Sequence, residues 1–278
     1  MTAGSGPDPV RPLAYAGSWY TSDPARLARE VDAWLEEVPP VAGTPLALLA
    51  PHAGLRYSGH VAAWSYAALR QAADEITVIL VGPSHYAYFR GFAILQRGGI
   101  ATPWGVLPID TMLAAELADR LDAPEHRAIH EREHALELHL PLLARVRPQA
   151  RVVPIIMGDQ ASAFVTELAD ALAAAARGRP VVLAASSDLS HYEPRERARA
   201  LDERMLAHLD ALDGDGLVRL LEREPGHACG GGPTAAVLLA ARALGATAGG
   251  VRRYADSGDV SGDTTRVVGY ASAVWLSA

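Results

Sequence analysis

The stretch Ile76-Thr77-Val78-Ile79-Leu80-Val81 is the strongest strand signal in the chain, because it is short, continuous and apolar. It runs directly into a polar loop, Gly82-Pro83-Ser84-His85. Two further runs, residues 46–50 and 180–185, have the same character. Continuous apolar runs of this length predict strands that are buried on both faces. The three runs therefore predict the interior of one sheet.

Stretches with helical periodicity separate the apolar runs. Asp23-Pro24 reads as an N-cap followed by proline at the first helical position, and it predicts a helix to about residue 37. Further expected helices cover residues 59–71, 161–176, 194–210, 215–223 and 234–244, and further expected strands cover residues 151–156, with Pro154 at an edge or a bulge, and 267–276.

This alternation predicts an α/β fold with a central parallel or mixed sheet and helices on both faces. No charge block, repeat or low-complexity linker divides the chain, so we expect a single domain over residues 1–278. The Gly/Pro-rich start predicts a flexible N-terminal segment over residues 1–14.

Composition excludes several classes of function. The formal net charge is -7, and all 25 basic residues are arginine, without a long basic run. This balance argues against a nucleic-acid or anionic-membrane partner. Without lysine, a Schiff-base lysine and a phosphate-loop lysine are both excluded. The single cysteine needs no oxidising compartment, and no signal peptide or membrane-spanning segment is recognisable, so we expect a cytoplasmic protein.

Polar loops follow three of the expected strands. They contain His52, His85, and the pair Asp188 and His191. In open α/β sheets ligands bind beyond the carboxyl ends of the strands, so these side chains are expected at one edge. A lone histidine after a strand is usually a hydrogen-bonded loop residue, but the same placement three times favours a site.

Cys229 lies just before a helix expected to begin near Thr234, beside the glycines 230–232. A helix N-terminus favours the thiolate, which binds metals and attacks electrophiles. A free cysteine is more commonly a small buried apolar residue. The neighbouring glycines allow a close approach of the backbone, which favours a functional role.

The segment from His130 to Pro141 allows two interpretations. His130, Glu131 and His134 match H-E-x-x-H, the zinc-peptidase pattern. In the other register Glu133, His134 and Glu137 form the functional face, and leucines face the core. The first turn is strongly charged and no clear third zinc ligand follows, so we favour the second register.

Short polar or glycine-containing motifs recur over nearly the whole chain: Ala16-Gly17-Ser18-Trp19-Tyr20, Pro51-His52-Ala53-Gly54, Tyr57-Ser58-Gly59, Gly82-Pro83-Ser84-His85, Thr102-Pro103-Trp104-Gly105, Glu133-His134-Ala135-Leu136-Glu137, Ser187-Asp188-Leu189-Ser190-His191-Tyr192, Cys229-Gly230, Ser257-Gly258-Asp259 and Val268-Gly269-Tyr270. In their order and spacing, these motifs resemble the MEMO family, the B component of the set called AmmeMemoRadiSam. Leu55 and Tyr86 depart from residues that are frequent in the family, and both could alter the shape of a pocket.

The resemblance implies a fold related to the class III extradiol dioxygenases, with a metal pocket at the sheet edge. It places the metal ligands on His52, His85 and Cys229, with Asp188 and His191 close by. The related dioxygenases bind iron(II) through two histidines and a carboxylate. Cys229 replaces that carboxylate unless Asp188 takes the role. We expect iron first, with copper or zinc competitive because thiolate is a softer donor.

The remaining polar residues are candidates for catalysis. His191 could act as a general base near neutral pH, and Asp188 could orient it or a ligand histidine. In the resemblance the Glu-His-x-x-Glu motif falls on His134 and Glu137, which could bind substrate or form a second acid/base pair, and it leaves His130 outside.

Three functions remain open at this point. The first is a metal-dependent redox enzyme, a dioxygenase-like oxidoreductase acting on a small aromatic or otherwise activated substrate. The second is a non-catalytic module that holds a metal or an anionic ligand for a partner. The third is a zinc-dependent hydrolase using His130 and His134. The family also implies a functional link to AMMECR1-like and radical SAM proteins.

Overall fold

The centre of the computed structural model is a mixed sheet, and the structure describes residues 8–224 and 226–277. Four neighbouring strands in its middle are parallel, and antiparallel strands flank them on both sides. Over the described ranges the strand order is β10 (Ala248–Asp256), β11 (Val267–Ser277), β2 (Thr44–Ala50), β8 (Val181–Ser186), β3 (Thr77–Pro83), β7 (Arg151–Met157) and β4 (Phe92–Ile94), and the short β9 (His191–Glu193) also pairs with β11.

The parallel strands β2, β8 and β3 end at the same edge of the sheet. Their residues are almost completely buried, as the continuous apolar runs predicted. Each strand continues into one of the polar loops that contain His52, His85 and Asp188. The expected mixed α/β architecture is therefore confirmed.

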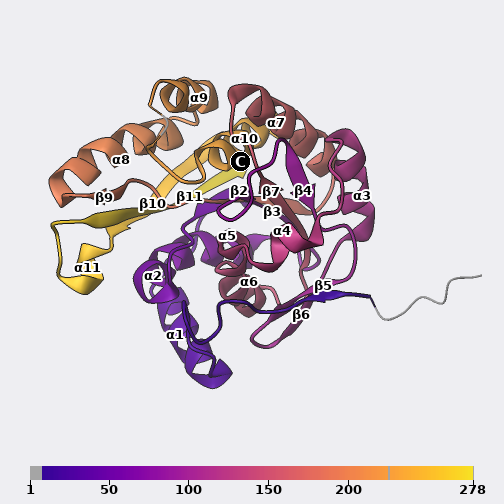
Figure 1. Cartoon of the computed structure of the whole chain (residues 1–278), viewed down its shortest axis with the longest axis horizontal. Coiled ribbons are helices and arrows are strands. Elements are labelled where there is room, and N and C mark those ends of the chain that lie inside the picture. The colour runs from indigo at the N-terminus through magenta and orange to yellow at the C-terminus, as the bar shows by residue number, and fades with distance from the viewer. Residues whose placement is uncertain (1–7, 225, 278) are drawn as a thin grey trace, which may run out of the picture.

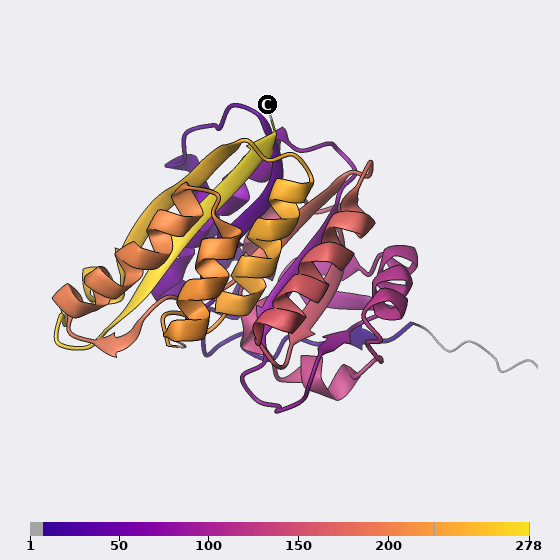
Figure 2. The ribbon, with the colours of Figure 1, turned by 90° about the horizontal axis from the view of Figure 1, so that it is seen from above.

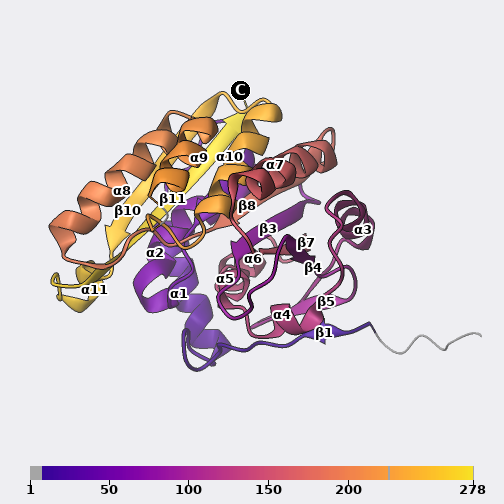
Figure 3. The same cartoon turned by 45° about the horizontal axis from the view of Figure 1, so that its top comes forward.

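Helices cover both faces of the sheet (Figures 1 and 2). One face is covered by the later helices, among which α10 packs on β8, β2 and β3. The opposite face carries α1, α2, α5 and α6, with α2 packed on β11 and β2 (Figure 3). The bounds are α1 (Pro24–Glu36), α2 (Leu55–Tyr66), α3 (Thr111–Arg120), α4 (Arg127–Glu131), α5 (His134–Glu137), α6 (Leu140–Val146), α7 (Ser162–Ala176), α8 (Arg195–Asp210), α9 (Gly214–Arg223), α10 (Gly231–Ala243) and α11 (Gly258–Ser261), with a 3-10 turn at Ala67–Gln71.

A second, three-stranded sheet brings the N-terminal segment onto the domain. It contains β1 (Val10–Arg11), β5 (Gly99–Thr102) and β6 (Gly105–Pro108). We expected residues 1–14 to be flexible, and residues 1–7 lie outside the described residues. Residues 8–14 differ from the expectation, because β1 pairs with β5 and the Arg11 side chain is buried.

Element boundaries show smaller differences. The helix after His52 begins at Leu55 rather than near residue 59, and α10 begins at Gly231 rather than near Thr234. Pro154 was expected at an edge or a bulge, but β7 is an interior strand whose neighbour β4 stops pairing at Ile155. In the described part of the chain, no helix combines the length and the apolar character that crossing a bilayer requires.

Candidate metal centre

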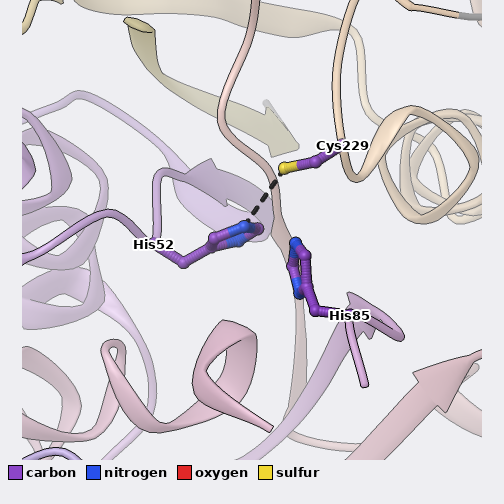
Figure 4. A group of neighbouring side chains, drawn as sticks. All are labelled: His52, His85 and Cys229. Carbon is purple, nitrogen blue, oxygen red and sulfur yellow. Dashed lines mark hydrogen bonds between the residues drawn. The ribbon is translucent and has the colours of Figure 1, made fainter. Parts of the chain in front are cut away.

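Three loops place the predicted metal ligands around one point. His52 follows β2, His85 follows β3, and Cys229 lies two residues before the start of α10. One ligand atom from each of the three lies within 4.8 Å of the others. Cys229 Sγ lies 3.1 Å from His52 Nε2. In Figure 4 the rings of His52 and His85 both point toward the Cys229 sulfur.

The loop that carries His52 is fixed by Asp188. Its Oδ1 accepts hydrogen bonds from the backbone N–H groups of His52, at 2.8 Å, and of Ala53, at 3.2 Å. Burial raises the pKa of Asp188 above its ordinary value. The Asp188 carboxyl therefore ties the loop after β8 to the loop after β2, and this contact gives it a structural role beside the predicted catalytic one.

Glu133 holds His85 in place. Glu133 Oε1 lies 2.8 Å from His85 Nδ1, and Oε2 accepts the backbone N–H of His85 at 2.7 Å. Burial opposes ionisation of this carboxyl, but the hydrogen bonds from His85 prevail and lower its pKa. An ionised carboxylate only accepts, so Nδ1 must donate, and in the neutral ring Nε2 then carries the free lone pair. A carboxylate behind a ligand histidine is a common arrangement at metal sites.

Glycine at position 230 lets Cys229 approach the sheet closely. A Cβ at Gly230 would lie 2.1 Å from the backbone oxygen of Ser186 and 2.8 Å from Ser187 Cβ. Cys229 Sγ also accepts the backbone N–H of Asp188 at 3.3 Å. The cysteine is thus locked against the end of β8 by backbone packing.

The electrostatics of Cys229 differ from the sequence expectation of a thiolate favoured by the helix dipole. Burial raises the pKa of the thiol, and the charge of Asp188 raises it further. Burial also lowers the pKa of His52 well below its ordinary value. The Cys229 thiol and the His52 ring are therefore neutral at pH 7 without a cation. A bound cation would reverse the preference of the sulfur, because coordination deprotonates a thiol.

His134 lies beside this centre rather than in it. Its ring stacks at a tilt on His85, with centroids 4.2 Å apart, and on Trp19, with centroids 4.4 Å apart. His85, Glu133 and His134 also form a group whose ligand atoms lie within 4.8 Å. In that group the Glu133 oxygens are already engaged in hydrogen bonds with His85. The Nε2 atoms of His52 and His85 instead face Cys229 (Figure 4). Burial lowers the pKa of His134 to about 4, so it is a neutral pocket residue.

Glu137 does not reach the pocket. Its side chain is fully buried and pairs with Arg11 at 2.6 Å. The same carboxylate accepts the backbone N–H groups of Ala14 and Tyr15 and the hydroxyl of Tyr20. The predicted pairing of Glu137 with His134 as catalytic groups is therefore corrected: Glu137 anchors the N-terminal segment, and its lone pairs are consumed there.

His130 is also outside the site, which removes the zinc-peptidase interpretation. His130 lies near the end of α4, and His134 is the first residue of α5. Arg132 and Glu133 between the two helices are not helical. The two histidines therefore do not share a helix face, as the H-E-x-x-H pattern requires. His130 Nε2 instead contacts the backbone oxygen of Ala93 at 3.1 Å, in the core.

A cavity of about 860 Å³ opens onto the three ligands. Asp188, His191 and His134 line it, so these predicted catalytic residues share the pocket with the predicted ligands. Tyr192 stands at the same wall with φ +61°, a left-handed conformation that is strained for a non-glycine residue and clusters at functional sites. The aromatic and aliphatic lining comes from Trp19, Tyr57, Tyr192 and Val268.

Two residues behind the proposed ligands were missed by the sequence analysis. Ser186, the last residue of β8, contacts His52 Nδ1 at 2.7 Å. It directly precedes the Ser187-Asp188 motif, which could have marked it. His139, which contacts Ser186 in turn, lies in an apolar helical stretch and looks like an ordinary core histidine.

Comparison with known proteins shows the family to which the chain belongs. The Memo-like protein family profile matches residues 11–274. A MEMO1 family protein of Methanothermobacter thermautotrophicus is 36% identical, covering 94% of this chain and 99% of the relative. One of Methanopyrus kandleri is 35% identical, covering 95% and 98%. An uncharacterized Escherichia coli K12 protein of known structure shares the fold, with a TM-score of 0.53 and 17% identity, covering 81% of this chain and 98% of that one. The chain therefore belongs to the Memo-like protein family.

Proposed function

We propose that this chain binds one transition-metal ion through His52, His85 and Cys229 and uses it in redox chemistry on a small organic substrate. The observation that carries the proposal is the 3.1 Å approach of His52 Nε2 to Cys229 Sγ at the base of a large cavity. Two imidazoles and a thiolate suit iron, copper or zinc. Iron(II) is our first candidate, and the function would be dioxygenase-like.

The hydrogen bonds of the two histidines are consistent with metal binding. The Nδ1 atoms of both histidines are engaged behind the site, by Ser186 and by Glu133, which leaves Nε2 of each ring for an ion. A bound ion would supply a Lewis-acid and redox centre with positions open toward the cavity. The protein's own groups would then bind and orient the substrate.

The other pocket residues divide the remaining tasks. His191 would accept a substrate proton. Asp188 would keep the loop that carries His52 in position by accepting the backbone N–H of His52. His134 is buried and neutral, and it would contact the substrate beside His85. Trp19, Tyr57 and Tyr192 offer flat apolar walls for a ring or another planar group.

Metal analysis of anaerobically purified protein tests the proposal. His52→Ala, His85→Ala and Cys229→Ser should each abolish tight binding of iron(II), copper or zinc and leave the fold intact. His126→Ala is the matched control, because His126 is an exposed histidine outside the pocket lining. Stoichiometric metal in all three ligand variants would refute the assignment. Oxygen consumption with a substrate would establish turnover.

A second candidate is a module that binds an anionic ligand without turnover. It is supported by Arg56, which lines the cavity and forms no ion pair within the described residues. Ligand binding without turnover under any metal would favour this module, acting through a partner. We also propose a cytoplasmic setting and a functional link to AMMECR1-like and radical SAM proteins, which co-purification of the three proteins would test.

A further inference from the structure

Ser186 lies at the centre of a buried polar network behind the proposed metal centre. Its side chain is completely buried, and it does not line the cavity. Its Oγ lies 2.7 Å from His52 Nδ1, 2.8 Å from His139 Nε2 and 2.6 Å from the backbone oxygen of Ala135. Three partners around one hydroxyl leave little freedom in the placement of the hydrogen atoms.

The hydrogen count determines the direction of each bond. A serine hydroxyl has one hydrogen to donate and two lone pairs to accept with. The oxygen of Ala135 is only an acceptor, so the Ser186 hydrogen must point to it. Both ring nitrogens must then donate to Ser186 Oγ, because an unprotonated nitrogen there would face a second lone pair.

This assignment fixes His52 as the tautomer with hydrogen on Nδ1. Its Nε2 is left with a free lone pair, and Nε2 is the atom that lies 3.1 Å from Cys229 Sγ. A metal ligand needs this free lone pair. The tautomer required for coordination is thus already selected by Ser186.

From Ser186 the network continues through His139 and ends at the hydroxyl of Tyr66. His139 donates through Nε2, so its Nδ1 is an acceptor, and it receives the Tyr66 hydroxyl at 2.8 Å. The side chains of His139 and Tyr66 are buried. Burial lowers the pKa of His139 to about 3, so its ring is neutral at pH 7. Every polar atom of this chain of bonds has a partner, and none is charged.

The two proposed ligand histidines are therefore supported differently. Glu133 supports His85 with a carboxylate, whereas Ser186 supports His52 with a neutral hydroxyl. A neutral acceptor cannot take the proton from Nδ1, so the His52 ring remains a neutral donor of one lone pair. Satisfied buried networks of this kind hold a single arrangement.

We propose that Ser186, His139 and Tyr66 form a positioning network that sets the His52 tautomer and aims its Nε2 at the metal. This inference rests on the proposed metal-binding function. The three residues touch neither substrate nor metal, so they are positioning residues and not catalytic ones.

The first measurement is the tautomer of His52 in metal-free wild-type protein, by nitrogen-15 NMR of labelled histidine. The expected result is hydrogen on Nδ1 of His52 and on Nε2 of His139. Hydrogen on Nε2 of His52 would overturn the proposal without any variant.

The second measurement is titration with cobalt(II), followed through its thiolate charge-transfer absorption. Ser186→Ala should mix the two His52 tautomers and weaken cobalt binding by about 10- to 100-fold, the usual loss when the partner behind a metal ligand is removed. Ser186→Cys keeps one hydrogen but is a weaker acceptor, so an intermediate loss is expected. It also serves as the folded variant if Ser186→Ala is too unstable.

Ser65→Ala is the matched control, because Ser65 is also a fully buried serine, and its hydroxyl forms hydrogen bonds with the backbone oxygens of Leu49 and Ala273. It should leave cobalt affinity and the His52 tautomer unchanged. Wild-type protein that binds no metal would overturn the proposed function and the positioning role together. Wild-type binding that neither Ser186 variant alters would overturn the positioning role alone.

Discussion

The Arg11 guanidinium and the Glu137 carboxylate form a buried ion pair at 2.6 Å, with side-chain exposures of 4% and 0%. Glu137 lies on α5, a helix that begins at the pocket residue His134, whereas Arg11 lies in β1. Arg11 also donates to the backbone oxygens of His130 and Glu133. The pair therefore fastens the N-terminal segment, including the turn that carries Trp19, to the wall of the pocket.

Glu137→Gln is expected to destabilise the protein by about 3–5 kcal/mol, because it leaves the Arg11 charge buried without a partner. Denaturant unfolding measures this loss. Metal affinity should change little, since Glu137 does not line the cavity that contains the three proposed ligands. Glu30→Gln, which removes a partner from the pair with Arg26, should change the free energy of unfolding far less, because both side chains of that pair are solvent-exposed. If Glu137→Gln lowered the free energy of unfolding no more than Glu30→Gln does, the anchoring role of Glu137 would be contradicted.

The sheet interior and the site edge could be predicted because both follow from local sequence. Apolar runs mark the strands β2, β3 and β8, and parallel strands must end at one edge. The motifs after these strands then place His52, His85 and Asp188 together. Cys229 came from the family resemblance and from the glycines beside it, since no strand leads to it.

The roles of Glu137 and Glu133 could not be read from the sequence. They are four residues apart, and a helix would place them on one face, but the chain becomes helical only at His134. Glu133 instead caps α5 through the Ala135 N–H and turns toward His85. The partner of Glu137 lies 126 residues away, and such pairs are invisible to periodicity.

Glu133→Gln should reduce metal affinity by about 10- to 100-fold while preserving the fold. The amide would present N–H hydrogens to a region where His85 and Ala135 already donate. The His85 ring would then lose its fixed tautomer. Titration of the metal-free variant with iron(II) or cobalt(II) measures the change, and affinity equal to wild type would show that Glu133 does not orient His85.

His130 should make the protein less stable in mild acid. Burial lowers its pKa to about 3 in the folded chain, against 6.5 ordinarily. Below about pH 6.5 the unfolded chain binds a proton that the folded chain does not, so stability falls as pH decreases toward 3. At pH 5 this amounts to about 2 kcal/mol, at about 1.36 kcal/mol per pH unit.

His130→Gln keeps an N–H donor for Ala93 and removes the titration. Its unfolding free energy should fall less than that of wild type between pH 7.5 and pH 5. Equal losses in both proteins would contradict the buried neutral state of His130. The metal content of the variant should match wild type, since His130 lies outside the metal centre.

Asp188→Asn and His191→Ala should change reactivity more than metal content. Asparagine keeps an Oδ1 acceptor for the backbone of His52 and Ala53, so the ligand loop should hold its position. His191 is not one of the three ligands. Elemental analysis beside a turnover or ligand-binding assay separates the two effects, and loss of metal equal to that of Cys229→Ser would make either residue a ligand.

Gly230→Ala tests whether backbone packing sets the position of Cys229. The added methyl would lie 2.1 Å from the backbone oxygen of Ser186, which belongs to an interior strand and has little room to move. The segment holding Cys229 must therefore shift relative to the end of β8, which changes the position of Sγ relative to His52, and metal affinity should fall by at least about tenfold. Gly226→Ala is the control, because a methyl there meets nothing within 4 Å. A displaced sulfur could not keep the same coordination. Equal metal affinity of Gly230→Ala and Gly226→Ala would therefore show that the position of Cys229 does not depend on this contact.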